Sequence, residues 1–323
     1  MIIPSMLPGP SLARGELTAA VDIGSNTVRL LVASVNQGIL NPVYCFRKIT
    51  RLAGGLTEDT GLAPAAMQRT LSALLEVKEI LLQYGVERLR AVGTEALRKA
   101  ANGKDFVQEA QRLTGLDIHI IDGVEEARLS CLGVLSALAT IPHKCLIFDI
   151  GGGSTEFILW ENHQISFQAS YPLGVVRLSE KGHTEENKGD TIKSVLAHLE
   201  LDLRKAGLFA EILRSEVPLI GTAGTVTTLA AIDLKMSQYD RDKINNHTLS
   251  TKNLGQMLEP LEMLCPVERE DIPGMEKGRG DLILPGLRTV LALMALFQKD
   301  SLVVSDAGLL EGVILDLDDR RVS

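Results

Sequence analysis

Two short glycine-rich segments contain residues whose types and spacing could bind a phosphate chain. They are Asp22-Ile23-Gly24-Ser25-Asn26-Thr27 and Asp149-Ile150-Gly151-Gly152-Gly153-Ser154-Thr155. A glycine-rich turn exposes consecutive backbone N–H groups to an anion with no Cβ in the way, and Ser and Thr hydroxyls add donors. The aspartate before the glycine could hold hydrated Mg²⁺. Taken singly, each segment is better explained as a tight hairpin turn, but the matched pair favours phosphate binding.

Carboxylates that could orient or deprotonate a water molecule follow each segment. Glu125 and Glu126 stand just after Gly123, in the first turn of an expected helix, where acidic residues also serve simply as partners of the helix dipole. Glu156 stands among apolar residues on the strand that leaves the second glycine-rich turn. It could be a second metal or water ligand, or the first residue of that strand to face solvent.

Two further segments could contact phosphate. Gly221-Thr222-Ala223-Gly224-Thr225 follows a short apolar run and opens a helix, whose first N–H groups could bind an anion or could simply be capped by threonine. Arg98, in Thr94-Glu95-Ala96-Leu97-Arg98, could grip phosphate with its planar guanidinium, although by itself an exposed helical arginine is the more common explanation.

Several other chemistries lack support in the sequence. The four cysteines form no CxxC pair, the six histidines show no metal-binding spacing, and neither a GxSxG elbow nor a GxxxxGK[ST] loop occurs. The formal net charge is −8, from 33 Lys and Arg against 41 Asp and Glu, which disfavours binding to DNA or to an anionic membrane. The sequence shows no signal peptide or membrane span, and we expect a cytoplasmic protein.

The chain length of 323 residues predicts two domains. Apolar runs predict strands at 17–24, 27–35, 43–52, 88–92, 116–121, 144–150, 155–160, 164–171, 217–220 and 302–305. Helices are predicted at 64–84, 94–101, 105–113, 125–139, 190–206, 224–233, 254–264, 282–297 and 307–317. The pattern of strand, glycine-rich turn and strand restarts 127 positions after Asp22. We therefore expect two duplicated α/β domains with the equivalent turns facing an interdomain cleft.

Taken together, these motifs resemble the exopolyphosphatase/guanosine pentaphosphate phosphohydrolase family of the actin-like superfamily. The resemblance covers about residues 18–318. The most specific segments are Glu125-Glu126-Ala127-Arg128 and Asp149 through Glu156, supported by Ala20 through Asn26, Gly93 through Arg98, Gly221 through Thr225 and Ser305 through Gly312. It implies two actin-like (ribonuclease H-like) α/β domains, at 17–130 and 131–306. A flexible extension at 1–16 and a C-terminal helix at about 307–323, packing back on the first domain, complete the expected organisation.

The resemblance also implies roles for individual residues. Glu126 matches the catalytic base and Arg98 a phosphate-contacting arginine. Asp149 and Glu156 match residues that hold Mg²⁺ or its waters. The implied phosphate-binding residues are Asp22, Gly24, Ser25, Asn26, Gly151, Gly152, Gly153, Ser154, Gly221, Thr222, Gly224 and Thr225.

Two departures from the family pattern stand out. Longer members carry additional helical domains, including an HD-type module, that this sequence lacks, so we expect a preference for shorter chains. Asp122 stands where a small residue is expected before Gly123.

The leading hypothesis is a Mg²⁺-dependent exopolyphosphatase that releases terminal orthophosphate from inorganic polyphosphate. A guanosine pentaphosphate 5′-phosphohydrolase is the nearest alternative, because both substrates end in a phosphoanhydride. A kinase of the same superfamily using ATP, and a non-catalytic sensor of polyphosphate or nucleotide, are the remaining alternatives. A homodimer is a possible assembly.

Overall fold

The computed structural model describes residues 16–57, 60–179 and 185–322, which form two compact units. Unit 1 contains the described residues up to Ser136 together with those from Gly308 onward, and unit 2 contains those from Ala137 to Ala307. The predicted boundary at 130/131 falls inside helix α4 (Gly123–Ser136), and the units divide after that helix because its hydrogen-bonded turns continue to Ser136. The predicted extension at 1–16 lies outside the described residues except for Glu16.

Unit 1 is built on a five-stranded sheet in the order β3-β2-β1-β4-β5. Its strands are β1 (Thr18–Ile23), β2 (Thr27–Asn36), β3 (Ile39–Ile49), β4 (Arg88–Gly93) and β5 (Ile118–Ile120). The first three strands form an antiparallel meander, and β4 and β5 continue the sheet in parallel with β1. The parallel strands β1 and β4 therefore end at one edge of the sheet, where the loops that follow them meet.

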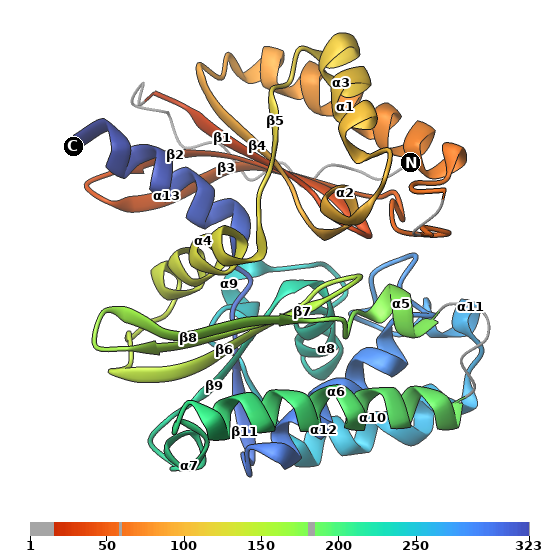
Figure 1. Ribbon diagram of the computed structural model, residues 1–323, viewed down its shortest axis with the longest axis vertical. Helices are drawn as coiled ribbons and strands as arrows, with labels where there is room; N and C mark the ends of the chain where they lie inside the picture. The colour runs from red at the N-terminus through yellow and green to blue at the C-terminus, as the bar shows by residue number, and fades with distance from the viewer. Residues whose placement is uncertain (1–15, 58–59, 180–184, 323) are drawn as a thin grey trace. The chain divides into compact units, whose positions relative to one another are not determined.

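Both faces of this sheet are covered by helices (Figure 1). Because side chains alternate along a strand, Val21 of β1 packs in the cluster that includes α1 (Pro64–Tyr84) and α3 (Gly103–Thr114). The next residue back, Ala20, packs in the cluster that includes α4 and the C-terminal helix α13 (Leu309–Val322). A short helix, α2 (Glu95–Lys99), follows β4.

Unit 2 is built on a six-stranded sheet in the order β10-β11-β9-β6-β7-β8. Its strands are β6 (Lys144–Ile150), β7 (Thr155–Glu161), β8 (Gln164–Tyr171), β9 (Leu219–Thr222), β10 (Thr248–Ser250) and β11 (Ser301–Val304). Its longer helices are α6 (Glu185–Lys205), α8 (Ala223–Asp233), α10 (Thr251–Met263) and α12 (Ile283–Leu296). Its shorter ones are α5 (Val175–Ser179), α7 (Phe209–Ile212), α9 (Arg241–Ile244) and α11 (Pro266–Arg269). One large apolar cluster joins the sheet to α6, α8, α10 and α12.

The two sheets repeat one plan, as the duplication hypothesis requires. The strands β3-β2-β1-β4-β5 correspond to β8-β7-β6-β9-β11, with the same antiparallel meander and the same parallel continuation, and β10 is an added edge strand. Even the irregularity in the outer hairpin recurs. The register shifts after Val32 in unit 1 and after Leu159 in unit 2, ten residues beyond the aspartate in each case. The prediction of two duplicated α/β domains is confirmed.

Some predicted elements needed correction. The strand β3 begins at Ile39 rather than 43, because an edge strand tolerates Pro42, which cannot donate to a ladder. The elements α5, α7, α9, α11 and β10 were not predicted, because segments of three to five residues show no period of their own. The equally short α2, β5, β9 and β11 fall within or overlap predicted ranges. Within residues 16–57, 60–179 and 185–322, no helix is both long enough and apolar enough to cross a membrane.

Candidate active site

The two glycine-rich turns have the same backbone geometry. In unit 1 the Gly24 N–H donates to the carbonyl of Thr27 at 3.0 Å, and in unit 2 the Gly151 N–H donates to the carbonyl of Ser154 at 2.9 Å. Each bond closes a four-residue turn between two antiparallel strands. Both turns therefore serve as hairpin connections, and whether they also bind phosphate depends on where their remaining N–H groups point.

In unit 2 the turn is fastened from one side by α5. The Gly151 carbonyl accepts from the Val175 N–H at 3.1 Å, and the Gly152 carbonyl accepts from the Val176 N–H at 2.9 Å. A trans peptide is planar, with its N–H opposite its C=O. The N–H groups of Gly152 and Gly153 therefore point away from α5, and no hydrogen bond from either group occurs within the described residues. Two adjacent donors on one side of a turn are what an anion-binding turn requires.

In unit 1 the turn is fastened by the segment that follows β3. The Asn26 carbonyl accepts from the N–H groups of Thr50 and Arg51, both at 2.9 Å, and the Ser25 carbonyl accepts from Ala53 at 2.8 Å. Asn26 is 7% exposed, and neither its side-chain oxygen nor its side-chain nitrogen has a hydrogen-bond partner among the described residues. Buried polar groups are usually satisfied, so this amide is available to a ligand.

An aspartate precedes the turn in both units, but the residue that stands opposite it carries the opposite charge in the two units. Asp22 stands opposite Arg29 across β1 and β2, and Asp149 stands opposite Glu156 across β6 and β7, in equivalent register. In unit 1 the Arg29 guanidinium donates twice to one Asp22 oxygen, at 2.9 and 2.6 Å, which neutralises that buried aspartate. In unit 2 the equivalent pair consists of two carboxylates. The two turns are thus chemically unequal, and the carboxylate pair of unit 2 is the one suited to a cation.

The carboxylates of unit 2 fit a hydrated Mg²⁺. Glu156 is 3% exposed, and one of its oxygens accepts from the hydroxyls of Ser154 at 2.5 Å and Ser170 at 2.7 Å, so the side chain is held in place. No group of three or more His, Cys, Asp or Glu residues with metal-binding geometry occurs within the described ranges. Mg²⁺ is commonly held by only one or two carboxylates together with water and substrate phosphate. Asp149 and Glu156 meet that requirement.

The segment Gly221–Thr225 lies beside this turn within unit 2. The parallel register places Thr222 next to Asp149 and Gly221 next to Phe148. A Cβ on Gly221 would lie 2.7 Å from the Phe148 ring, so glycine is needed for the two strands to pack here.

Within Gly221–Thr225 the hydroxyl of Thr222 does not cap α8, as was considered possible, but donates to the Ala307 carbonyl at 2.9 Å. Thr225 is 3% exposed, and its methyl group packs at Gly286 of α12. Ala223, between them, has φ +67°, a strained conformation for a residue with a Cβ, of the kind that often marks a functional loop.

The two adjacent glutamates of unit 1 have different surroundings. Glu125 accepts hydrogen bonds from Arg128 at 2.9 Å and from Arg90 at 3.1 Å. The hydrogen bond from Arg128 leads the interactions that outweigh desolvation and lower the Glu125 pKa from 4.5 to about 2. Both arginines also bind Asp316 of α13, at 2.7 and 2.8 Å. Glu125 therefore belongs to an ion network that ties α4 and β4 to the C-terminal helix.

Glu126 instead meets Arg98, the other residue expected to be catalytic. The Nη1 atom of Arg98 lies 3.1 Å from a Glu126 carboxylate oxygen and donates to the Ile121 carbonyl at 2.8 Å. The Glu126 side chain is 13% exposed. The structure thus brings together Glu126 and Arg98, which are 28 positions apart in the sequence.

The unexpected Asp122 has a local structural role. Its carboxylate accepts the Glu125 N–H at 2.8 Å, and its carbonyl accepts the Glu126 N–H at 3.0 Å. These are the bonds of a residue that caps the first turn of a helix. Asp122 therefore fixes the start of α4 and with it the backbone that carries both glutamates.

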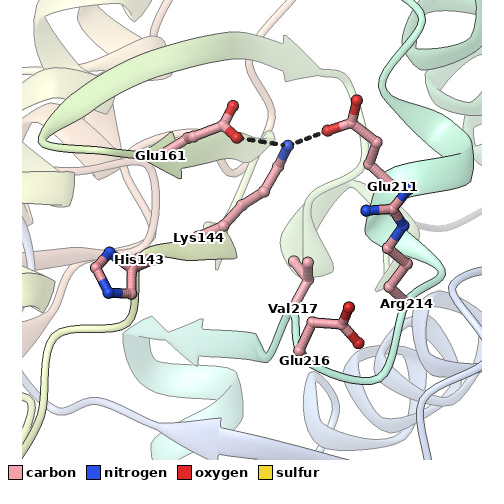
Figure 2. A pocket seen from close by; sticks show the side chains of 7 residues that line it. All are labelled: His143, Lys144, Glu161, Glu211, Arg214, Glu216 and Val217. Atoms are coloured by element: carbon pink, nitrogen blue, oxygen red, sulfur yellow. Dashed lines mark hydrogen bonds and ion pairs between the residues drawn. The ribbon is translucent and has the colours of Figure 1, made fainter.

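A cavity of about 330 Å³ in unit 2 lies away from these segments. Figure 2 shows its lining residues, His143, Lys144, Glu161, Glu211, Arg214, Glu216 and Val217. His143 and Lys144 mark the beginning of β6, whereas the glycine-rich turn follows its end. Burial opposes the charge of Lys144, but hydrogen bonds from its ammonium to Glu211 and Glu161 outweigh that effect and raise its pKa. With three carboxylates against two cations, this cavity is a poor phosphate site.

Sequence reasoning missed Arg29 and Ser170. Both contact a predicted site residue, Asp22 and Glu156 respectively. Arg29 could have been found from the length of the hairpin. The residue seven positions after each aspartate stands opposite it, as Glu156 does for Asp149 and Arg29 does for Asp22. Ser170 could not be found in this way, since its pairing depends on the bulge in β7 and β8.

Comparison with known proteins gives a consistent result. Residues 31–321 match the Ppx/GppA phosphatase family. Exopolyphosphatase 2 of Mycobacterium tuberculosis is 32% identical over 317 residues, which is 93% of this chain and 98% of that protein. The bifunctional 3-dehydroquinate synthase/phosphatase of Fusobacterium nucleatum is 31% identical over 319 residues, and the match spans 93% of this chain but 46% of that longer protein.

The crystal structure of the Aquifex aeolicus member of the Ppx/GppA family is similar in fold. It shares 29% identity with this chain, at a TM-score of 0.75 and with 95% of this chain and 99% of that chain covered. The predicted resemblance and the predicted enzyme class are both confirmed. The chain belongs to the Ppx/GppA phosphatase family and is a hydrolase of phosphoanhydride bonds.

Proposed function

We propose that the protein is a Mg²⁺-dependent exopolyphosphatase that releases orthophosphate from the end of inorganic polyphosphate. The observation that carries this proposal is the contact of Glu126 with Arg98, while the neighbouring Glu125 is held in a separate ion network. This arrangement supplies one carboxylate for proton transfer and one guanidinium for phosphate. The exopolyphosphatase among the similar proteins supports the choice of substrate.

The proposed reaction gives predicted site residues one task each. In unit 1, Glu126 accepts a proton from a water molecule whose oxygen attacks the terminal phosphorus. The bond from that phosphorus to the bridging oxygen breaks, and the bridging oxygen stays with the shortened chain. In unit 2, the N–H groups of Gly152 and Gly153 and the Ser154 hydroxyl bind phosphate oxygens.

Mg²⁺ would be held by Asp149 and Glu156, and when bound it would offset negative charge on the phosphate oxygens. The amide of Asn26 and the Arg29–Asp22 pair would bind phosphate in unit 1. Because Arg29 already compensates Asp22, we assign Asp22 to orienting that arginine and not to the metal.

The test compares Glu126→Gln with Glu125→Gln, a matched control one residue away. Phosphate release is measured from long-chain polyphosphate, short polyphosphate, guanosine pentaphosphate and ATP, with and without Mg²⁺. We expect Glu126→Gln to lower kcat about 10²–10⁴-fold, the usual contribution of a general base, and Glu125→Gln to keep kcat within a few-fold. Activity of Glu126→Gln equal to that of wild type would show that Glu126 is not the general base.

The substrate comparison separates the alternatives. Preference for guanosine pentaphosphate over polyphosphate would keep the proposed hydrolysis of a terminal phosphoanhydride but make guanosine pentaphosphate the substrate. Transfer of phosphate from ATP to an added acceptor without hydrolysis would indicate a kinase. Binding of polyphosphate without release from any of the four compounds would indicate a sensor.

A further inference from the structure

The helix α5 brings an arginine to the phosphate-binding turn of unit 2 that the proposed reaction does not use. The Arg177 N–H donates to the Gly152 carbonyl at 3.2 Å, alongside the bond from Val176. The contact between turn and helix is tight. A Cβ on Gly174 would lie 2.2 Å from the Gly152 carbonyl oxygen and 2.3 Å from the Gly153 carbonyl carbon. Arg177 is therefore fixed to the turn by its backbone.

The side chain of Arg177 has no structural function that the structure reveals. It is exposed, and within the described ranges it makes no ion pair and no hydrogen bond. Other arginines near the proposed site are paired with carboxylates, Arg29 with Asp22 and Arg98 with Glu126. Arg177 thus offers five donors and a full charge to a ligand.

The charge balance of unit 2 indicates what Arg177 would bind. Asp149 and Glu156 place two carboxylates beside the turn, and one Mg²⁺ would balance only those two charges. A polyphosphate chain adds roughly one negative charge per internal phosphate, and the α5 N–H groups are already bonded to turn carbonyls. Arg177 is exposed and its backbone is bonded to the turn, but α5 lies on the other side of the turn from the Gly152 and Gly153 N–H groups. Its guanidinium therefore suits phosphates that lie beyond the terminal one.

We propose that Arg177 of unit 2 binds the substrate chain, contacting phosphate groups other than the one released, and thereby sets affinity for longer chains. This proposal rests on the proposed function. Arg177 contributes to substrate binding and not to the chemical step, so its removal changes KM and leaves kcat nearly constant.

The experiment compares Arg177→Gln and Arg177→Lys with Lys252→Gln. Lys252 is an exposed cation at the start of α10, which follows β10. Because β10 runs antiparallel to β11, α10 begins at the opposite edge of the sheet from the glycine-rich turn. Lys252→Gln therefore removes the same charge from unit 2 at a distance from the proposed site.

For Arg177→Gln we expect KM for long-chain polyphosphate to rise about 5–30-fold at low ionic strength, with kcat changed less than twofold. The rise in KM shrinks for tripolyphosphate and at high salt, because the contact is exposed and screened. Arg177→Lys keeps part of the affinity, and Lys252→Gln leaves KM within twofold. A KM for Arg177→Gln within twofold of wild type, or an equal rise in Lys252→Gln, overturns the proposal.

Equilibrium binding of long-chain polyphosphate, measured with Mg²⁺ by calorimetry, separates this proposal from the proposed function. If the wild-type protein binds polyphosphate in a way that depends on Arg177 but releases no phosphate, the role of Arg177 in binding is supported and the proposed exopolyphosphatase activity is rejected. If phosphate is released but neither binding nor KM depends on Arg177, the exopolyphosphatase activity is supported and the role of Arg177 is rejected. Absence of both binding and release rejects both.

Discussion

At the scale of single residues, the most instructive pair is Glu125 and Glu126. In the sequence they are equivalent, since both stand in the first turn of a helix. In the structure one is held by two arginines that also bind α13, and the other meets Arg98. The resemblance pointed to the second glutamate. The contacts supply a physical reason for the difference, because a carboxylate tied to two guanidinium groups is a poor proton acceptor.

The first prediction concerns the pH dependence of stability in Glu125→Gln. The Glu125 pKa is lowered from 4.5 to about 2 in the folded protein. A carboxyl whose pKa is lowered by folding stabilises the folded protein fully at pH values above its pKa in the unfolded chain. This stabilisation is lost as the pH falls toward its pKa in the folded protein. We expect Glu125→Gln to be about 1–2 kcal/mol less stable than wild type at pH 6, and this difference to shrink between pH 4.5 and pH 2.

Denaturant unfolding of both proteins at several pH values measures this difference. A stability gap that stays constant from pH 6 to pH 2 would contradict the assignment of Glu125 to the ion network. Activity per folded molecule serves as the control, and we expect it to stay within a few-fold of wild type.

At the scale of structural elements, the short helix α5 decides how the turn of unit 2 is presented. Its first N–H groups bind the carbonyls of Gly151 and Gly152, which directs the opposite N–H groups outward. The helix α5 was not predicted, since its five residues show no helical period of their own. The close contact of Gly174 with Gly152 and Gly153 also depends on the tertiary structure.

The second prediction concerns Gly174→Ala. The added Cβ would lie 2.2–2.3 Å from atoms of Gly152 and Gly153, so the turn or the helix must shift. We expect a loss of about 1–3 kcal/mol in unfolding free energy and at least a tenfold loss of phosphate release. The control is Gly189→Ala in α6, where a Cβ meets nothing within 4 Å. That change is expected to stabilise the protein by about 0.5–1 kcal/mol.

Thermal unfolding and phosphate release, measured on both alanine variants, give the answer. Wild-type activity in Gly174→Ala would show that the contact between α5 and the turn is not needed for function.

At the scale of the whole molecule, the chain leaves unit 1 after Ser136 and returns to it at Gly308. The returning helix α13 packs closely on α4. A Cβ on Gly133 would lie 1.8 Å from the Gly308 carbonyl oxygen, and one on Gly312 would lie 1.8 Å from that of Leu129. Apolar residues of α13, among them Val313, also cover one face of the unit 1 sheet. Unit 1 is therefore completed by the last residues of the chain.

The third prediction follows from this connectivity. A chain that ends at Ala307 lacks α13, exposes the apolar face of unit 1 and leaves Arg90 and Arg128 without Asp316. We expect amide hydrogen exchange in β1 and β4 to become much faster, while β6 and β9 of unit 2 keep their protection as an internal control. Unchanged protection in β1 and β4 would show that unit 1 does not depend on α13.

By itself the sequence located every described strand except β10, together with the duplication and the two turns. Their signals are local: an apolar run, a glycine in a tight turn, and a repeat at a fixed spacing. The family resemblance added the roles of the candidate residues and the reaction class. The tertiary structure decided what depends on groups distant in the chain. In the folded protein Glu125 and Glu126 contact different arginines, and Asp22 pairs with Arg29. The N–H groups of Gly152 and Gly153 point away from α5. These differences arise because the charge and hydrogen-bond partners of a side chain are set by packing, which a single sequence does not display.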